Sequence, residues 1–383
     1  MKIGIFTDSY LPYTSGVVRS IQTFTEELTN HGHEVFIFAP SYRNCRKESR
    51  IFRFSSIPSP TNHDFTLAMP FSIRLRPTIK KLNLDLIHVH SPFLLGRLGA
   101  RYARMLGIPL VFTYHTLYEQ YVHYVPFAQS FTKELAQKIS RAFCNYCDAV
   151  FVPTGVIRDY LQGIGVKKPI RIVPTGIKVA EYQNGDRGWL QRHFNLPPGE
   201  KILLFVGRLG QEKNINFLME CFIIVSREIS NTRLVLVGGG PEEEELKNRA
   251  KELGISEQVT FTGVLPPSDV VNCYAGSDIF VFSSVTETQG IVITEAKAAG
   301  LPVVAVAAYG VSEMIQDGID GYLTELEPLQ FAEKVCFLLK DVNIRKEMSL
   351  RGQQNAEMLS VAKCTATLVD CYRQVIERNT LVN

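Results

Sequence analysis

Two carboxylates eight residues apart, Glu287 and Glu295, are the side chains of this chain best spaced to hold a phosphorylated sugar. Carboxylates accept hydrogen bonds from hydroxyls, so Glu287 is a candidate contact for a transferred sugar and Glu295 for a ribose. Gly290 precedes a predicted helix over residues 291–299, and the backbone N–H groups of a helix's first turn bind phosphate. We therefore place a diphosphate at Gln289, Gly290 and Ile291. The alternative is a strand–loop–helix unit with two solvated glutamates.

A guanidinium and an ammonium follow the apolar strand predicted over residues 202–206. Arg208 offers a planar fork of N–H donors and Lys213 a point charge, which together suit the charge that develops on a leaving diphosphate. Gly16 lies in a loop before a predicted helix in the first half of the chain, where backbone N–H groups could approach the same phosphate. The alternative interpretation of Arg208 and Lys213 is a pair of surface cations.

Glycines and a histidine follow other predicted strands. Gly239 and Gly263 would let the backbone approach a nucleoside base closely, although turn glycines look the same in a sequence. His115 follows an apolar strand, where its imidazole could bond a sugar hydroxyl or orient an acceptor; a structural histidine is the alternative. His88 and His90 look like a metal pair, but we expect their side chains to point in opposite directions and interpret both as structural.

Short apolar strands alternate with helical segments in both halves of the chain. The predicted strands are residues 2–6, 35–39, 86–89, 110–113 and 149–152 in the first half and 202–206, 234–237, 259–262, 279–282, 303–306 and 321–323 in the second. This order predicts an α/β fold with two doubly wound, Rossmann-like parallel sheets, which bind ligands beyond the carboxyl ends of their strands. Two such domains suggest a cleft between them.

The boundary between the two predicted domains lies in a connector over residues 174–198 that is rich in Gly, Asn and Pro. We assign residues 1–177 to a first domain and residues 178–360 to a second domain. Residues 361–383 look helical, and we expect them to pack back on the first domain.

Composition indicates a globular protein, because 383 residues, 45% of them hydrophobic, suffice for two domains of ordinary size. No run of eighteen apolar residues appears, and the first residues predict a buried strand rather than a signal peptide. Eight scattered cysteines favour cytosolic thiols, and the close pair Cys144 and Cys147 lacks the second pair that a zinc site needs. We expect a cytoplasmic protein without a metal site.

Charge is segregated along the chain. Residues 1–180 contain 22 Lys and Arg against 11 Asp and Glu, a net charge of +11, whereas the remaining residues contain 19 against 27, a net charge of −8. A basic half suggests that this half faces an anionic surface. Charge alone does not separate a lipid surface from nucleic acid.

Basic residues beside apolar stripes favour a membrane surface. In residues 69–84, Phe71, Leu75 and Ile79 recur at helical spacing with cations around them, and a second basic, apolar stretch covers residues 131–143. The candidate membrane and acceptor residues are Arg74, Arg76, Lys80, Lys81, Tyr118, Lys133, Lys138 and Arg141. The alternative is an ordinary solvated helix that packs inward.

Together these residues resemble the retaining, nucleotide-sugar-dependent glycosyltransferases with the GT-B fold. The resemblance covers nearly the whole chain and rests on the two glutamates, on Gly207-Arg208 with Lys213, on the Pro-Thr-Gly-Ile sequence at residues 174–177 and on the Gly16 loop. It implies that Arg208 and Lys213 bind the diphosphate, Glu295 the ribose, Glu287 the donor sugar, and His115 the sugar or the reacting centre. The resemblance further implies that the first domain binds the acceptor and faces a membrane and that the second binds the donor. It also implies catalysis without a metal or another cofactor.

Within this family the chain is similar to the bacterial 1,2-diacylglycerol 3-glucosyltransferases, in residues 115–124 and 286–290. The resemblance implies a peripheral enzyme on the inner face of the cell membrane that transfers glucose from UDP-glucose to diacylglycerol with retention. Some positions depart from common family patterns: Ser15 precedes Gly16 where a second glycine is frequent, Lys178 stands where Asp is frequent, and residues 287–290 replace an aromatic–acidic–Gly pattern.

Three alternatives remain open. The same chemistry could act on a phosphoinositide, a polyprenyl-linked sugar or a soluble glycan. A non-catalytic protein that binds nucleotide sugars or nucleic acid would use the basic half, and a UDP-sugar epimerase would use the same two-domain plan. Glu287 and Glu295 argue against a non-catalytic protein. We therefore expect a nucleotide-sugar donor, a lipid acceptor and an anionic membrane as partners, and no nucleic acid.

Overall fold

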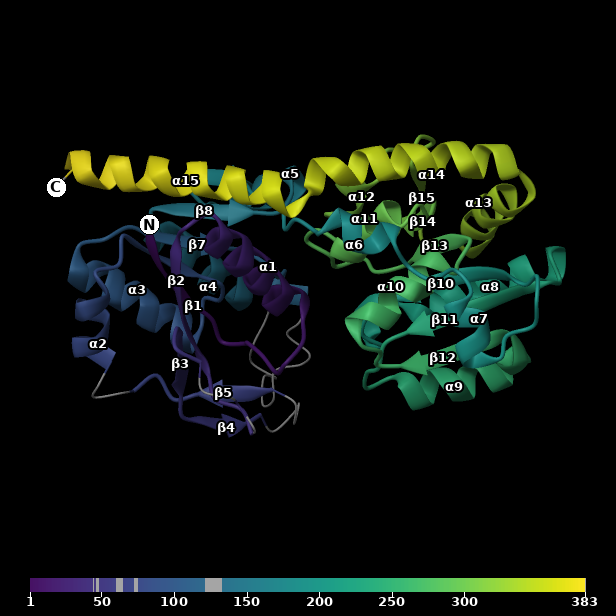
Figure 1. Ribbon diagram of the computed structural model, residues 1–383, viewed down its shortest axis with the longest axis horizontal. Coiled ribbons are helices and arrows are strands. Elements are labelled where there is room, and N and C mark those ends of the chain that lie inside the picture. The colour runs from purple at the N-terminus through teal and green to yellow at the C-terminus, as the bar shows by residue number, and fades with distance from the viewer. Residues whose placement is uncertain (44, 46–47, 60–64, 72–74, 121–132, 383) are drawn as a thin grey trace. The chain divides into compact units, whose positions relative to one another are not determined.

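The computed structural model describes residues 1–382 except residues 44, 46–47, 60–64, 72–74 and 121–132. The chain divides into two compact units, Met1–Gly176 with Val361–Asn383 and Ile177–Ser360 (Figure 1). Each unit is built on its own parallel sheet with helices packed against it, so the predicted α/β fold with two doubly wound sheets is confirmed.

The sheet of the first unit has the strand order β3-β2-β1-β6-β7-β8-β9. Its strands are β1 (Lys2–Phe6), β2 (Glu34–Pro40), β3 (Ile51–Phe54), β6 (Leu86–Val89), β7 (Leu110–Thr113), β8 (Ala149–Val152) and β9 (Ile170–Ile172). A separate antiparallel pair consists of β4 (Ser56–Pro58) and β5 (Thr66–Ala68). Every residue of β6, β7 and β8 is buried, which is typical of parallel strands covered on both faces.

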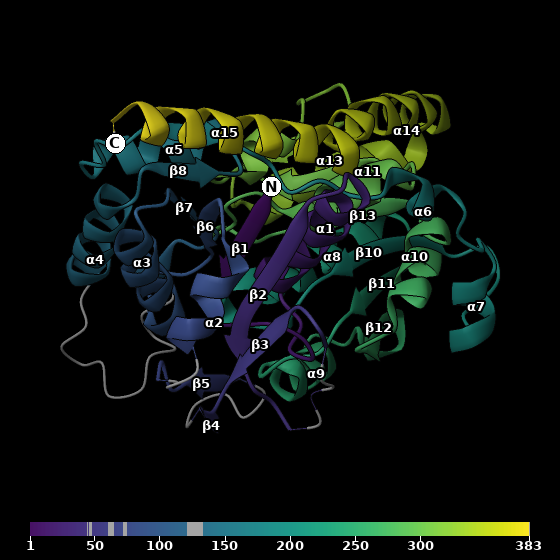
Figure 2. The same ribbon diagram turned by 60° about the vertical axis from the view of Figure 1, so that its left-hand side comes forward.

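The C-terminal helix belongs to this first unit. The unit's helices are α1 (Gly16–Asn30), α2 (Leu75–Leu82), α3 (Leu94–Leu106), the short η1 (Tyr118–Gln120), α4 (Lys133–Tyr146), α5 (Gly155–Gly163) and α15 (Val361–Val382). α15 packs against α1 (Figures 1 and 2), so the helix predicted from about residue 361 is confirmed. Among the described helices, including the long α15, none carries an apolar stretch that could span a bilayer.

The sheet of the second unit has the order β12-β11-β10-β13-β14-β15. Its strands are β10 (Lys201–Val206), β11 (Thr232–Val237), β12 (Val259–Gly263), β13 (Ile279–Phe282), β14 (Val303–Val306) and β15 (Gly321–Thr324). Its helices are α6 (Val179–Gln183), α7 (Trp189–Phe194), η4 (Gln211–Lys213), α8 (Ile215–Glu228), α9 (Glu243–Glu252), η5 (Ser256–Gln258), α10 (Pro267–Ala275), α11 (Ile291–Ala298), α12 (Val311–Met314), α13 (Pro328–Lys340), α14 (Val342–Ala356) and η6 (Glu357–Leu359).

Strand order reverses beside the first strand of each sheet, and doubly wound sheets bind ligands at this switch point. The reversal lies between β1 and β6 in the first unit and between β10 and β13 in the second. β10 and β13 pair in register, with Leu203 opposite Ile279, so the chain leaves both strands at the same edge of the sheet. The predicted Arg208, Lys213 and Glu287 all follow these two strands.

Candidate active site

Two buried serines hold the short helix η4 that ends at Lys213. Ser283 and Ser284 directly follow β13 and are fully buried. The Ser283 hydroxyl donates to the carbonyl of Lys213 at 2.7 Å, and the Ser284 hydroxyl donates to the carbonyl of Glu212 at 2.9 Å. These bonds tie η4 to the end of β13. Neither serine was predicted, although two adjacent serines directly after an apolar strand are a signal visible in the sequence.

The ammonium of Lys213 donates to the carboxylate of Glu287 in an ion pair. The two side chains are 15% and 19% exposed, and the ammonium lies 6.0 Å from the centre of the Phe282 ring. The sequence predicted separate roles for these two residues, and the structure places them in direct contact. The pair combines a cation suited to phosphate with a carboxylate suited to hydroxyls. Arg208 is exposed on the loop that follows β10.

Direct backbone packing shapes the loops after β10 and β11. A Cβ on Gly238 would lie 2.0 Å from the carbonyl oxygen of Gly207, and a Cβ on Gly240 would lie 2.2 Å from that of Leu209. The N–H of Leu209 donates to the carbonyl of Gly239 at 3.0 Å. Gly239, predicted for the donor site, therefore lies against the loop that carries Arg208.

Gly263 and Gly290 both have left-handed backbone, with φ of +68° and +81°. The carbonyl of Gly263 accepts from the N–H of Gly238 at 3.0 Å, so it borders the same loops. Gly290 precedes Ile291, the first residue of α11, and Gln289 before it is buried. The predicted diphosphate site thus lies at the start of a helix after β13, while its occupancy by a diphosphate stays a prediction.

Gly310 holds the Glu287 loop in place. Its N–H donates to the carbonyl of Glu287 at 3.0 Å, and an added Cβ would lie 2.1 Å from the carbonyl oxygen of Thr288. Because this contact is backbone to backbone, no side chain can rotate away to relieve a clash.

We expect Gly310→Ala to displace the Glu287 loop and to lower kcat/KM by about tenfold to a hundredfold, since small misplacements of site residues have effects of this size. The free energy of unfolding should fall by about 1–3 kcal/mol, the usual cost of overpacking. Steady-state kinetics and urea unfolding measure the two quantities. Gly163→Ala is the control, because its added Cβ would meet nothing within 4 Å. Wild-type kinetics for Gly310→Ala would contradict this role.

Glu295 is fully buried on α11, and the hydroxyl of Tyr274 on α10 donates to its carboxylate at 2.9 Å. The tyrosine fixes the direction of the carboxylate within the second unit. Contact between Glu295 and a ribose stays a prediction. Tyr274 was not predicted, because nothing in the spacing of Tyr274 and Glu295 along the sequence indicates that their side chains meet.

A buried ion pair anchors the other end of α11. The ammonium of Lys297 lies 2.5 Å from the carboxylate of Asp320, and the two side chains are 7% and 0% exposed. Lys297 also donates to the carbonyl of Met314 at 2.6 Å, and the amide of Asn355 on α14 donates to Asp320 at 2.7 Å. Burial lowers the pKa of Lys297, and the charge and hydrogen bond of Asp320 oppose that shift. The pair fixes α11, and with it the helix start at Gly290, against the rest of the unit.

The first unit carries a loop and a carboxylate at its own switch point. Gly16 begins α1 beside Ser15, whose hydroxyl accepts from the N–H of Val18 at 3.3 Å. An added Cβ on Gly16 would meet nothing within 4 Å. After β1, Asp8 accepts from the hydroxyl of Ser91 and, at 2.9 Å, from the N–H of Leu95, while burial raises its pKa. Asp8 was missed by the sequence analysis.

Three histidines gather at the carboxyl ends of β6 and β7. The rings of His88 and His90 lie 4.1 Å apart, so the expectation that they point in opposite directions is wrong: residues two apart on a strand share a face. His90 meets His115 at 2.8 Å, and His88 meets the hydroxyls of Thr113 and Tyr372, each at 2.6 Å. No metal-binding group of three ligands occurs in the described part of the chain.

Burial lowers the pKa of both His88 and His115 to about 3 and the pKa of His90 well below its usual value. All three imidazoles are therefore neutral at physiological pH. A neutral His115 could donate or accept a hydrogen bond to a sugar hydroxyl, but it would not act as a cation. The position of His115 is therefore compatible both with a structural role and with the predicted contact to a sugar.

We expect the free energy of unfolding to fall as the pH drops below 6.5, because these histidines become protonated in the unfolded chain but stay neutral in the folded one. The stability that a neutral His88 contributes is complete above its unfolded pKa and is lost toward a pKa of about 3. Between pH 7 and pH 5 the loss for His88 alone is about 1–2 kcal/mol. Urea titrations at several pH values measure it.

His88→Asn should flatten this pH dependence, and His31→Ala, at an exposed position on the same unit, should keep it. A wild-type slope in His88→Asn would show that other groups cause the acid destabilisation.

The described residues predicted to contact a membrane or acceptor lie on α2, η1 and α4, and their contact with a membrane stays a prediction. On α2, Arg76, Lys80 and Lys81 are exposed. Of the predicted apolar stripe, Leu75 and Ile79 are buried within the unit, whereas Phe71, which precedes α2, is 79% exposed. Lys133, Lys138 and Arg141 on α4 are exposed, and Tyr118 is half-buried with its ring edge against Tyr114 and Phe93. Arg74 lies outside the described residues, as do residues 131–132 and 121–124 of the segments quoted above.

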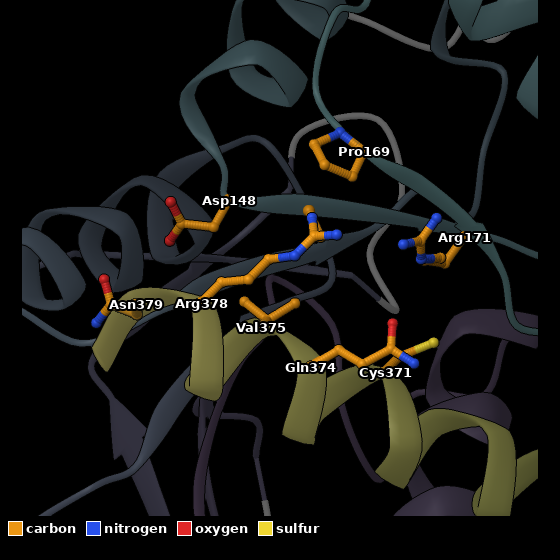
Figure 3. Close-up of a pocket in the computed structure, with 9 residues that line it drawn as sticks. Asp148, Pro169, Arg171, Cys371, Gln374, Val375, Arg378 and Asn379 are labelled. Carbon is orange, nitrogen blue, oxygen red and sulfur yellow. The ribbon is translucent and has the colours of Figure 1, made fainter. Parts of the chain in front are cut away.

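A cavity opens between α15 and the edge of the first sheet (Figure 3). Asp148 and Pro169 line it directly before β8 and β9, which places the cavity at the amino ends of the strands. Arg171 and Arg378 reach into it from β9 and α15. Because doubly wound sheets bind their substrates at the carboxyl ends, this cavity is not the candidate active site.

The chain matches two protein-family descriptions in succession. Residues 14–181 match Glycosyltransferase Family 4, and residues 189–355 match Glycosyl transferases group 1. Every residue predicted for the donor site, together with His115, falls within these two segments.

Similar proteins extend the match to most of the chain. A Streptococcus pneumoniae protein named alpha-monoglucosyldiacylglycerol synthase is 36% identical over 84% of this chain and 75% of its own. An Acholeplasma laidlawii protein of the same name is 31% identical over 99% of this chain and 98% of its own. A Corynebacterium glutamicum protein named GDP-mannose-dependent alpha-mannosyltransferase is 29% identical over 85% of this chain and 77% of its own. The solved sucrose-phosphate synthase of Thermosynechococcus elongatus superposes with a TM-score of 0.80 at 20% identity, covering 98% of this chain and 99% of that one.

Proposed function

The chain belongs to the group 1 glycosyltransferases of the GT-B fold, and from this premise we propose that it transfers glucose from UDP-glucose to 1,2-diacylglycerol. The product would be an α-monoglucosyl diacylglycerol, formed with retention of the sugar's configuration. The names of two similar proteins support the acceptor and the sugar. A peripheral enzyme on the inner face of the cell membrane would meet both substrates.

The observation that carries the proposal is the contact between Lys213 and Glu287 at the switch point of the second sheet. A sugar diphosphate presents an anionic group beside hydroxyls, which is the pattern that a neighbouring ammonium and carboxylate would recognise. On binding, Lys213 would turn its charge to the diphosphate and Glu287 would accept from hydroxyls of the glucose. Arg208 and the start of α11 would share the diphosphate charge, and Glu295 would accept from the ribose.

The proposed chemistry depends on stabilising the leaving group. The acceptor hydroxyl oxygen attacks the anomeric carbon on the face from which the diphosphate leaves, and the bond from that carbon to the phosphate oxygen breaks. The departing phosphate oxygen takes the proton of the attacking hydroxyl, so UDP carries it away. Cations and N–H groups placed on the leaving oxygens in advance lower the barrier to this step.

Residues of the first unit would contact the reacting groups and the membrane. His115, neutral because burial lowers its pKa to about 3, would hydrogen-bond the sugar or orient the reacting hydroxyl. The backbone at Gly16 would approach the diphosphate, for which the open space around its Cα leaves room. The exposed cations Arg76, Lys80, Lys81, Lys133, Lys138 and Arg141 would hold the enzyme on an anionic membrane.

A second candidate keeps the fold and changes the substrates. The similarity to a protein named for GDP-mannose favours testing a GDP-sugar donor. The experiment is release of nucleotide by the purified protein with diacylglycerol in liposomes, comparing UDP-glucose, UDP-galactose, UDP-N-acetylglucosamine and GDP-mannose. Release from UDP-glucose alone, and only with diacylglycerol present, supports the proposal. Release that proceeds with GDP-mannose, or with a soluble glycan instead of diacylglycerol, overturns it in favour of the other donor or acceptor.

A further inference from the structure

A line of three arginines crosses the exposed surface of α3. Arg97, Arg101 and Arg104 are spaced by four and three residues and so share one face of the helix. All three are exposed, and α3 contains no acidic residue that could relieve their mutual repulsion. Like charges one turn apart destabilise a helix. An anion bound along this line would remove that repulsion.

A groove runs between this line and α4, which lies beside α3 (Figure 2). The α4 wall consists of Lys138, Ile139, Ala142, Phe143 and Tyr146. It therefore presents one cation and mainly apolar side chains to the arginines; Phe143 is 7% exposed and Tyr146 carries the wall's one hydroxyl. None of the ion pairs among the described residues involves Arg97, Arg101 or Lys138.

The apolar character extends beyond the groove. Within the groove, Arg104 lies over the ring of Tyr146 at 4.3 Å, and Tyr146 is 39% exposed. Three exposed apolar residues lie outside it. Leu94 and Met105, at the two ends of α3, are each 41% exposed, and Leu135 on α4 is 40% exposed. Cations next to exposed apolar side chains on two neighbouring helices match the interface of a membrane, where charge meets phosphate and apolar atoms meet acyl chains.

We propose that the α3–α4 groove binds one anionic phospholipid, with its phosphate at Arg97, Arg101 and Lys138 and its upper acyl region against Ile139, Phe143 and Tyr146. The inference rests on the proposed function, because it names the lipid that a membrane-bound enzyme would hold. A phospholipid fits better than a free phosphate, which would not contact the apolar wall of α4. It also fits better than a nucleic acid, which would leave Leu94, Met105 and Leu135 exposed to water.

The groove also refines the membrane face predicted from the sequence. Of the predicted residues, only Lys138 lines it. Arg141 points elsewhere, since its side chain lies 3.2 Å from the position that a Cβ on Gly165 would take. The arginines of α3 were not predicted as membrane residues. The apolar side chains that face them belong to α4, and a sequence pattern within one helix does not show such a pairing.

The test is co-sedimentation with vesicles of phosphatidylcholine with or without phosphatidylglycerol, at constant ionic strength. The variant Arg97→Gln/Arg101→Gln should bind phosphatidylglycerol vesicles more than tenfold more weakly than the wild type, since each cation contributes about fivefold. The control is Arg171→Gln/Arg378→Gln, which removes the same charge from two arginines of the first unit at the cavity beside α15. It should bind within about twofold of the wild type.

Equal losses for both double variants would mean that binding follows net charge, and would overturn the site. Displacement of the protein from vesicles by inorganic phosphate, at matched ionic strength, would assign the groove to a free anion and also overturn it. Wild-type turnover of diacylglycerol dispersed in a neutral detergent tests the proposed function separately. If the wild type is active in detergent but its vesicle binding does not depend on Arg97 and Arg101, only the lipid site is contradicted. If vesicle binding depends on these arginines but no turnover occurs, only the proposed function is contradicted.

Discussion

Lys213→Met should lower kcat by about a hundredfold to a thousandfold, the effect of losing one donor that stabilises developing charge. The substitution keeps the length of the side chain and removes only its charge. It deletes the cation proposed for the leaving diphosphate, and it leaves the carboxylate of Glu287, which is 19% exposed, without its ammonium. Steady-state kinetics with UDP-glucose and diacylglycerol measure the effect.

Lys340→Met is the matched control for this variant. Lys340 also forms an ion pair with a glutamate, Glu228, but both side chains are largely exposed, at 59% and 44%. The control should therefore keep wild-type turnover. Because Lys213 and Glu287 touch, Lys213→Met/Glu287→Gln should lose much less than the product of the two single effects. A kcat for Lys213→Met close to that of the wild type would remove this lysine from the active site.

Lys297→Met should lower the free energy of unfolding of the second unit by about 3–5 kcal/mol, because it leaves Asp320 charged, buried and without its cation. Asp320 is fully buried, and among the described residues its carboxylate would still accept from Asn355 and from the backbone of Gln316. Where the variant remains folded, the KM for UDP-glucose should rise, since Lys297 anchors the helix that begins at Gly290. Urea unfolding and steady-state kinetics measure the two effects.

Two further variants separate stability from positioning. Lys297→Met/Asp320→Asn should recover most of the lost stability, because no buried charge remains. Arg233→Met breaks a comparable pair, since Arg233 and Glu200 are each 10% exposed, but Arg233 lies near the amino end of β11, away from the site. It should lose stability and keep the wild-type KM. An equal rise in KM in Arg233→Met would reduce the role of Lys297 to general stability.

The fold could be predicted well from the sequence because its central strands are continuous apolar runs. β6 and β13 are buried at every position, and such runs stand out without any alignment. β9 was missed because it has three residues with an arginine in the middle, and β4 and β5 are equally short. Strands of this length carry no periodicity.

The sequence predicted which residues belong to the site better than it predicted which of them contact each other. Glu287 and Lys213 stood out by residue type and by their place after strands, but their contact joins positions 74 residues apart and depends on Ser283 and Ser284. Tertiary contacts such as Tyr274 with Glu295 leave no local pattern. The sequence left open whether Leu75 and Ile79 face a membrane or the interior, because helical periodicity shows that a helix has an apolar face and not what covers that face; the structure buries both.

The most direct test of the central claim is the structure of the product formed from UDP-glucose and diacylglycerol. The lipid would be extracted, purified and examined by proton NMR for the identity of the sugar, its anomeric configuration and the hydroxyl that carries it. We predict a single glucose in α linkage on the free hydroxyl of diacylglycerol, with one UDP released per glucose. A β linkage would contradict the retaining mechanism, and UDP release without any glycolipid would contradict the lipid acceptor.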